Sequence, residues 1–271
     1  IRLPPRSPLF PYTTLFRSEL WKTSGETATQ VLDIRPGNRG SEPRFLAQAG
    51  GNVYFSADDG TNGRELWRSN GTAVGTEMLL DAVAGEGGSF PDWLTPYEPE
   101  GESAMVLYAA SDATGDRELW SSSGAGKLTR RLAVLNPKGW GDPSELHVNG
   151  DTLVFSAQNN NVGRELHLMD LRTGTVSRAD IRSGSAGSDP HGFFSWDDEY
   201  TFFSADDGIV GPELWMTDGT VAGTQLVADL NAGPDGSYPW ILGRGGDLLY
   251  VQAATPSLGL QLYVVDLAAA P

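Results

Sequence analysis

The chain of 271 residues contains no cysteine, so disulfide bonds and thiolate metal sites are excluded. No run approaches the roughly 18 apolar residues that a membrane-spanning helix needs. Basic residues are scarce: 19 Lys and Arg face 35 Asp and Glu, which gives a formal net charge of -16. Because phosphate binding needs a basic surface, this charge argues against nucleic acid as a partner.

Helical patterning is also missing, since no segment keeps apolar residues at a 3.6-residue period. Glycine is frequent (34 residues), and so is proline (17), as expected where many short strands need tight turns. The composition therefore predicts an all-β protein.

The triplet Glu-Leu-Trp recurs along the chain. It occupies residues 19–21, 65–67, 118–120 and 213–215, with weaker copies at residues 165–167 and 261–263. Successive copies lie 46, 53, 47, 48 and 48 residues apart. A period of this length is typical of propellers and stacked repeats.

Each repeat predicts four short antiparallel strands. In the first full unit they are residues 43–48, 53–57, 64–69 and 76–81, separated by glycine-rich turns. Four such strands per roughly 48 residues predict the blade of a β-propeller. The predicted blades open near Pro43, Pro91, Pro143, Pro190 and Pro239.

The ends of the repeat leave two arrangements open. The fifth blade lacks a fourth strand. In one arrangement, the N-terminal strands at residues 19–34 complete this blade and close a five-bladed ring. In the other, the chain is an arc of a larger ring. Residues 7–18 resemble translated sequencing adapter, so we treat residues 1–18 as a non-native leader and residues 19–271 as one propeller domain.

Residues 213–220 read Glu-Leu-Trp-x-x-Asp-Gly-Thr. They resemble the ELWxxDGT repeat family of bacterial surface and secreted proteins, and the resemblance extends over most of residues 19–266. Other copies depart from the motif after the Trp. The resemblance implies a repeat array on an exported protein, extracellular or at the cell surface, with no catalytic residues to transfer.

The repeated triplet predicts structural roles. Alternation along a strand places the Leu on one face of the blade and the Glu and Trp on the other. We expect the Trp side chains to pack between blades, and each Glu to accept backbone N–H bonds from the glycine-rich loop before it. These structural residues are Trp67, Trp120, Trp215, Glu65, Glu118, Glu165 and Glu213.

One rim of the propeller is predicted to be acidic. The loops between second and third strands lie on the same rim as the crossovers between blades, and both are rich in Asp and Gly. Closely spaced oxygen ligands suit calcium, although Asp and Gly are also ordinary turn formers. The candidate metal ligands are Asp58, Asp59, Asp206, Asp207, Asp229, Asn231 and Asp235.

Aromatic residues fall on the same rim. Flat aromatic faces beside carboxylates and amides are what a carbohydrate-binding surface uses, whereas the alternative is that they cap blade interfaces. The candidate ligand-binding residues are Trp93, Trp140, Tyr238 and Trp240.

Catalytic patterns are weak. The three histidines, His147, His167 and His191, lack the spacing of metal ligands, and His167 stands where its repeat has Trp. The sequence therefore favours a non-enzymatic binding or adhesion module, with calcium as a candidate stabiliser and a protein or carbohydrate ligand. A carbohydrate-binding propeller is the alternative, followed by a glycoside-active enzyme with two rim carboxylates.

Overall fold

The computed structural model describes residues 17–124, 128–137 and 139–267. Its elements are β-strands, joined by glycine-rich turns, which confirms the predicted fold class. The described residues include no helix long and apolar enough to cross a bilayer. Most of the leader predicted for residues 1–18 lies outside the described residues.

Four sheets have four antiparallel strands each, paired in chain order. Each is one blade of a propeller. The strands are β3 (Arg44–Ala49), β4 (Asn52–Asp58), β5 (Arg64–Ser69) and β6 (Thr76–Leu80); β7 (Asp92–Tyr97), β8 (Met105–Ser111), β9 (Arg117–Ser122) and β10 (Arg130–Ala133); β11 (Ser144–Asn149), β12 (Thr152–Asn159), β13 (Gly163–Asp170) and β14 (Val176–Ala179); β15 (His191–Trp196), β16 (Tyr200–Asp206), β17 (Pro212–Thr217) and β18 (Gln225–Ala228).

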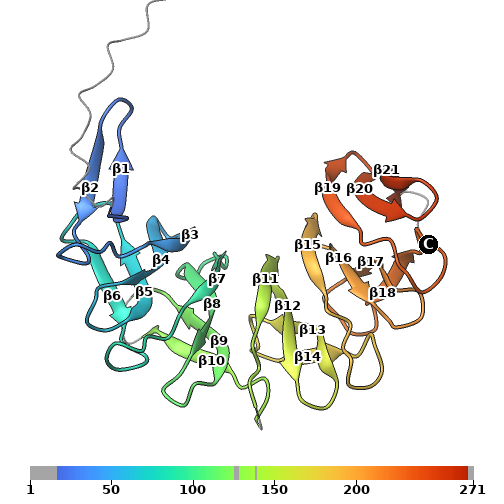
Figure 1. Ribbon diagram of the computed structural model, residues 1–271, viewed down its shortest axis with the longest axis horizontal. Helices are drawn as coiled ribbons and strands as arrows, with labels where there is room; N and C mark the ends of the chain where they lie inside the picture. The colour runs from blue at the N-terminus through green and yellow to red at the C-terminus, as the bar shows by residue number, and fades with distance from the viewer. Residues whose placement is uncertain (1–16, 125–127, 138, 268–271) are drawn as a thin grey trace, which may run out of the picture.

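A smaller sheet lies at each end of the series. In the described part of the chain, β1 (Leu20–Thr23) pairs only with β2 (Ala28–Leu32), and β19 (Trp240–Gly245), β20 (Leu248–Thr255) and β21 (Gly259–Asp266) form a three-stranded sheet. Figure 1 shows the sheets side by side around an open arc, with these two at opposite ends. In this structure β2 therefore does not add to β21, and the number of blades in a closed ring stays a prediction.

The first strand of each blade lies on the inner side of the arc, and the fourth strand lies outside (Figure 1). The core consists of five apolar clusters, one at each junction between neighbouring sheets. At each junction, the Leu of Glu-Leu-Trp packs against the middle strand of the next sheet. At the last complete junction, for example, Leu214 packs with Leu249 and Val251.

The repeated Trp side chains pack at the same junctions. Trp67 is buried with Leu20 of the preceding sheet, whereas Trp120 and Trp215 are half-buried against their clusters. His167 takes the Trp position of its blade and is buried, with its ring stacked 5.4 Å from that of Phe155. The side chain at this position is thus part of the junction whether it is Trp or His.

The Asp-Gly-Thr half of the repeat builds the turn between the third and fourth strands. Asp218 Oδ1 accepts hydrogen bonds from the amide (2.9 Å) and the hydroxyl (2.7 Å) of Thr220. Asn70 and Thr72 make the same two bonds in the first blade. Gly71 and Gly219 have φ values of 83° and 87°, in the left-handed region that glycine adopts without strain.

Candidate functional site

The Glu of the repeat is buried and holds the crossover that leaves its blade. Glu213 accepts hydrogen bonds from the amides of Leu230 (3.0 Å) and Asn231 (3.2 Å) and from the hydroxyl of Ser237 (2.6 Å). Burial raises the pKa of the equivalent carboxyl groups, which are Glu65, Glu118, Glu165 and Glu213.

The prediction that each Glu binds the loop before its triplet is wrong. The crossover that follows the fourth strand binds the Glu, not the loop before the triplet. The loop before the triplet is held by a different carboxylate. Asp59 Oδ1 accepts hydrogen bonds from the backbone amides of Thr61 (2.8 Å) and Asn62 (2.8 Å). Asp207 caps the corresponding loop of the fourth blade in the same way.

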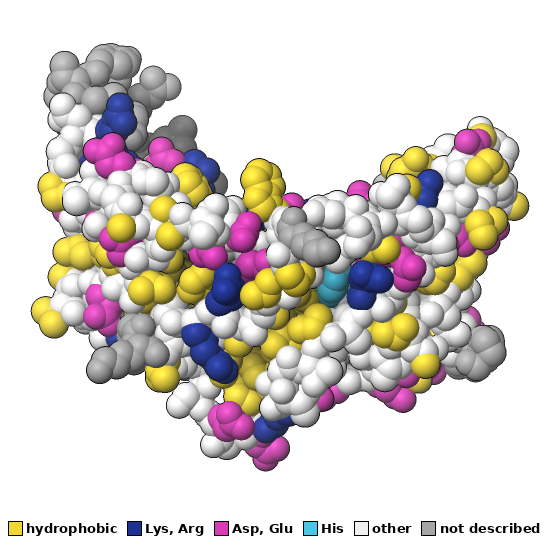
Figure 2. Space-filling model, turned by 90° about the horizontal axis from the view of Figure 1, so that it is seen from below, with side chains coloured by type: hydrophobic (Ala, Val, Ile, Leu, Met, Phe, Trp, Pro, Cys, Tyr) yellow, Lys and Arg dark blue, Asp and Glu magenta, His cyan; other side chains and the backbone are white. Residues whose placement is uncertain are grey.

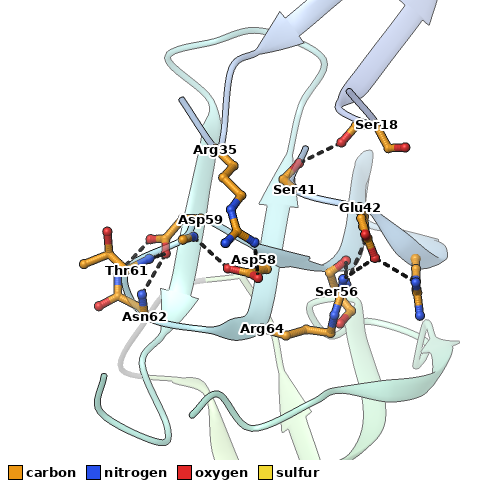
Figure 3. Close-up of polar contacts among 12 residues, drawn as sticks. Ser18, Arg35, Ser41, Glu42, Ser56, Asp58, Asp59, Thr61, Asn62 and Arg64 are labelled. Carbon is orange, nitrogen blue, oxygen red and sulfur yellow. Dashed lines mark hydrogen bonds and ion pairs between the residues drawn. The ribbon is translucent and has the colours of Figure 1, made fainter. Parts of the chain in front are cut away.

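Ion pairs link neighbouring blades along this rim. Figure 3 shows Arg35, in the crossover from the β1–β2 sheet, directed at Asp58 in the next sheet. Arg182 forms the same pair with Asp206 one junction before the last. These carboxylates thus balance arginines of the preceding crossover.

The seven candidate metal ligands do not form one cluster. Within the described ranges, no three His, Asp or Glu side chains are placed to share a metal ion. Four of the candidates serve the ion pairs and loop caps above, and the Asn231 side chain donates to the carbonyl of Gly236 (2.8 Å). Calcium binding stays a prediction.

The backbone at the start of the first strand of a blade adopts unusual φ values. In the four complete blades the residue before the repeated proline has a positive φ, as in Glu42 (47°) and Phe90 (51°), and so does the residue three positions later, as in Phe45 (55°) and Trp93 (51°). The strand pairing of these four blades shifts register at the same place, between the residue after the proline and the residue three positions beyond it. Positive φ strains non-glycine residues, so the surrounding contacts must hold these segments.

Arginine supplies those contacts in the first three blades. Arg64, directly before its Glu-Leu-Trp triplet, donates to the carbonyls of Glu42 (2.9 Å) and Ser56 (3.1 Å), as Figure 3 shows. Arg117 donates to the carbonyl of Phe90 (3.0 Å) in the same manner, and Arg164 to that of Asp142 (3.0 Å). Sequence reasoning missed this bond, although the repeated Arg before Glu-Leu-Trp was a readable signal.

The crossovers and these entry segments display the rim aromatics to solvent. The exposed fractions are 67% for Trp140, 65% for Tyr238, 60% for Trp240 and 38% for Trp93. Figure 2 shows hydrophobic side chains exposed among acidic and basic ones on one face of the molecule. The aromatics come from three different blades, and of the four only Tyr238 lines a cleft on this rim.

That cleft has a volume of about 490 Å³. One side is formed by the crossover at residues 185–189, and Tyr238 reaches it from the next crossover. Its charged side chains are Arg164, Arg182, Asp189 and Asp206, and His191 also lines it. The two arginines are already paired, Arg182 with Asp206 and Arg164 with Asp142, so the lining is polar but its charges are largely balanced.

The histidines do not come together. His147 Nε2 lies 2.7 Å from the Ser195 hydroxyl and joins β11 to β15, while His191 Nδ1 lies 2.9 Å from the carbonyl of Asp189 at the cleft. Burial lowers the pKa of His147, and that of His167 to about 4. His147 and His167 therefore have structural roles, and His191 lies at the cleft.

No protein-family model and no curated protein matches this sequence. Solved structures with a similar fold include a puromycin-hydrolysing peptidase of Mycobacterium tuberculosis (TM-score 0.57, 9% identity, 90% of this chain and 39% of that chain). They also include oligopeptidase B from Leishmania major (0.53, 12%, 90% and 34%) and the dihydro-heme d1 dehydrogenase NirN (0.52, 16%, 86% and 46%). The chain spans less than half the length of these proteins, and the similarity concerns the fold alone.

Proposed function

We propose that this chain is a non-enzymatic binding module of an exported bacterial protein of the ELWxxDGT-repeat type. The observation that carries the proposal is that charged and aromatic side chains on the rim have different roles. The repeated charged groups are engaged in holding the loops, whereas large aromatic side chains are presented to solvent. Exposed aromatic surface of this kind marks binding sites.

The ligand class follows from the cleft beside Tyr238. Its arginines are paired with carboxylates, so a strongly charged ligand would have to break an ion pair to enter. A neutral, hydroxyl-rich ligand can instead accept from the guanidinium groups and donate to the carboxylates while its ring lies on the phenol of Tyr238. A volume of about 490 Å³ is in the range of small-ligand sites. We therefore propose a neutral carbohydrate.

A glycan panel tests this proposal. Wild type, Tyr238→Ala and Tyr238→Phe are compared, with Trp93→Ala as the control for an exposed aromatic that does not line the cleft. We expect wild type, Tyr238→Phe and Trp93→Ala to bind the same glycans and Tyr238→Ala to lose them. Silence of the wild type on every neutral glycan would end the carbohydrate proposal.

Calcium stabilisation is a separate proposal, and its support is the Asp-rich composition of the rim loops. Chelation followed by a melting curve tests it. A lower melting midpoint that calcium restores would support it, and an unchanged midpoint would remove it.

A further inference from the structure

The last sheet of the arc exposes an apolar face. On β21 the large side chains at alternating positions are exposed: Leu260 and Leu262 at 61% each and Val264 at 51%. Their partners on β20 are Ala254, Gln252 and Tyr250, so these residues share one face of the sheet. The opposite face of the same sheet is buried against the fourth blade, through Leu249 and Val251.

The position of Leu262 in the repeat explains this face. It is the Leu of the last, weakened triplet, equivalent to Leu214 in the fourth blade. Every other copy of this Leu is buried, and Leu214 is fully so. At each of the five junctions it packs against the middle strand of the following sheet. Leu262 is thus half of an inter-blade junction.

The opposite end of the arc exposes the other half. Trp67 is 8% exposed because it packs against Leu20 of the sheet before it, whereas Trp21, at the same position of the first sheet, is 53% exposed. The C-terminal sheet therefore displays the Leu side of a junction and the N-terminal sheet displays the Trp side. The edge of β21 adds to this, because β5, β9, β13 and β17 each pair with a fourth strand, whereas β21 has no such partner among the residues that the structure describes.

We propose that the apolar face of β19–β21 is a docking surface for a further blade of this same repeat. The chemistry of the partner is read from the existing junctions, where the middle strand presents a large apolar residue followed two positions later by Ala. These pairs are Phe55 and Ala57, Tyr108 and Ala110, Phe155 and Ala157, Phe203 and Ala205, and Val251 and Ala253.

A second copy of this chain does not supply such a strand. All five of these pairs are already buried within the arc, with exposed fractions of 3% or less. A second copy could offer only the Trp21 side of its two-stranded sheet, which lacks the first and second strands of a blade. The surface therefore fits a further four-stranded blade, which would extend the arc shown in Figure 1.

The test adds a blade to the whole chain. In the extended protein, residues 1–263 are followed by a second copy of residues 216–267, which supplies a fourth strand for β21 and a new three-stranded sheet. Leu262→Gln is then compared in the original and extended chains by thermal melting. Leu214→Gln, at the buried equivalent position, serves as the control in both.

We expect the extended chain to melt at a higher temperature than the original. Leu262→Gln should leave the original midpoint nearly unchanged and lower the extended one by several degrees, as Leu214→Gln does in both chains. An extension built from residues 168–219 provides a second, independent blade.

Three outcomes would overturn the proposal. In the first, neither extension raises the midpoint or makes Leu262 sensitive to substitution. In the second, neither extended chain folds although the original does. In the third, sedimentation shows that the original chain is a dimer that Leu262→Gln dissociates, which would assign the face to a second copy.

Discussion

Ser89 binds Glu65 twice: its amide lies 2.9 Å from Oε1, and its hydroxyl donates to Oε2. The two residues are 24 positions apart, and the bonds close the crossover that carries the chain from one blade to the next. Ser41 makes the same pair of bonds with Glu19, at the junction of the first sheet. The second half of the crossover is thus fixed to the third strand of the blade it leaves.

The serine hydroxyl is expected to contribute measurably to stability. Ser188 is buried, and its hydroxyl donates to Glu165 Oε2 at 2.5 Å. Ser188→Ala removes a hydrogen bond to a charged group and should lower the free energy of unfolding by about 1.5–3 kcal/mol. Urea denaturation measures the change. Ser183→Ala, at an exposed position of the same crossover, is the matched control, and equal effects from the two variants would contradict this role for Ser188.

His167 is expected to make stability depend on pH. Burial lowers its folded-state pKa to about 4, from an ordinary value of 6.5. The unfolded chain therefore binds more protons than the folded one between these values, and the contribution to stability, full above pH 6.5, is lost as the pH falls to about 4. From the size of the shift, the loss is at most about 3 kcal/mol.

His167→Phe isolates this contribution, because other titrating groups are common to both proteins. The difference in unfolding free energy between wild type and variant should change between pH 6.5 and 4 and be flat above pH 7. Urea melts at a series of pH values measure it. A difference that does not vary with pH would show that His167 titrates normally.

Much of this fold could be read from the chain. Residues 64–69 were predicted as a third strand and match β5, because Gly63 and Asn70 bound a run of strand-forming residues. Sequence alternation also placed Trp67 at a junction. The crossover bonds of Glu65 do not follow from the sequence, because two glycine-rich loops flank the same rim and their spacing along the chain does not show which of them reaches the carboxylate.

The sequence predicts which aromatic residues lie on the rim, but it does not predict how they are arranged there. Trp93, Trp140, Tyr238 and Trp240 are exposed, but of the four only Tyr238 reaches the cleft. Trp93 and Trp140 belong to other blades, and Trp240, two residues after Tyr238, lies opposite Gln252 of β20. The left-handed backbone at Trp93 was also unpredictable, because local preference disfavours it and the tertiary bond from Arg117 to the carbonyl of Phe90 stabilises the segment.

The two tryptophans Trp67 and Trp21 should differ in their contribution to stability. They occupy the same position of the repeat, yet Trp67 is 8% exposed and Trp21 is 53% exposed. Trp67→Ala should lower the free energy of unfolding by about 3–5 kcal/mol, as for a core aromatic. Trp21→Ala should lower the free energy of unfolding by much less, about 1 kcal/mol or under. Comparable losses in urea denaturation would show that Trp21 is covered in solution.

Backbone strain at the rim predicts that a glycine substitution there does not lower the stability of the protein. Phe45 has a φ of 55° and a half-exposed side chain, and the fourth blade has Gly192, with a φ of 70°, at the equivalent position. Relief of the left-handed strain is worth about 1 kcal/mol, which offsets the greater flexibility that glycine gives the unfolded chain. Phe45→Gly should therefore be neutral or stabilising in urea denaturation. Phe45→Val, which keeps the strain and adds β-branching, should destabilise the protein, and the reverse order would show that the Phe45 ring rather than the backbone decides the residue at this position.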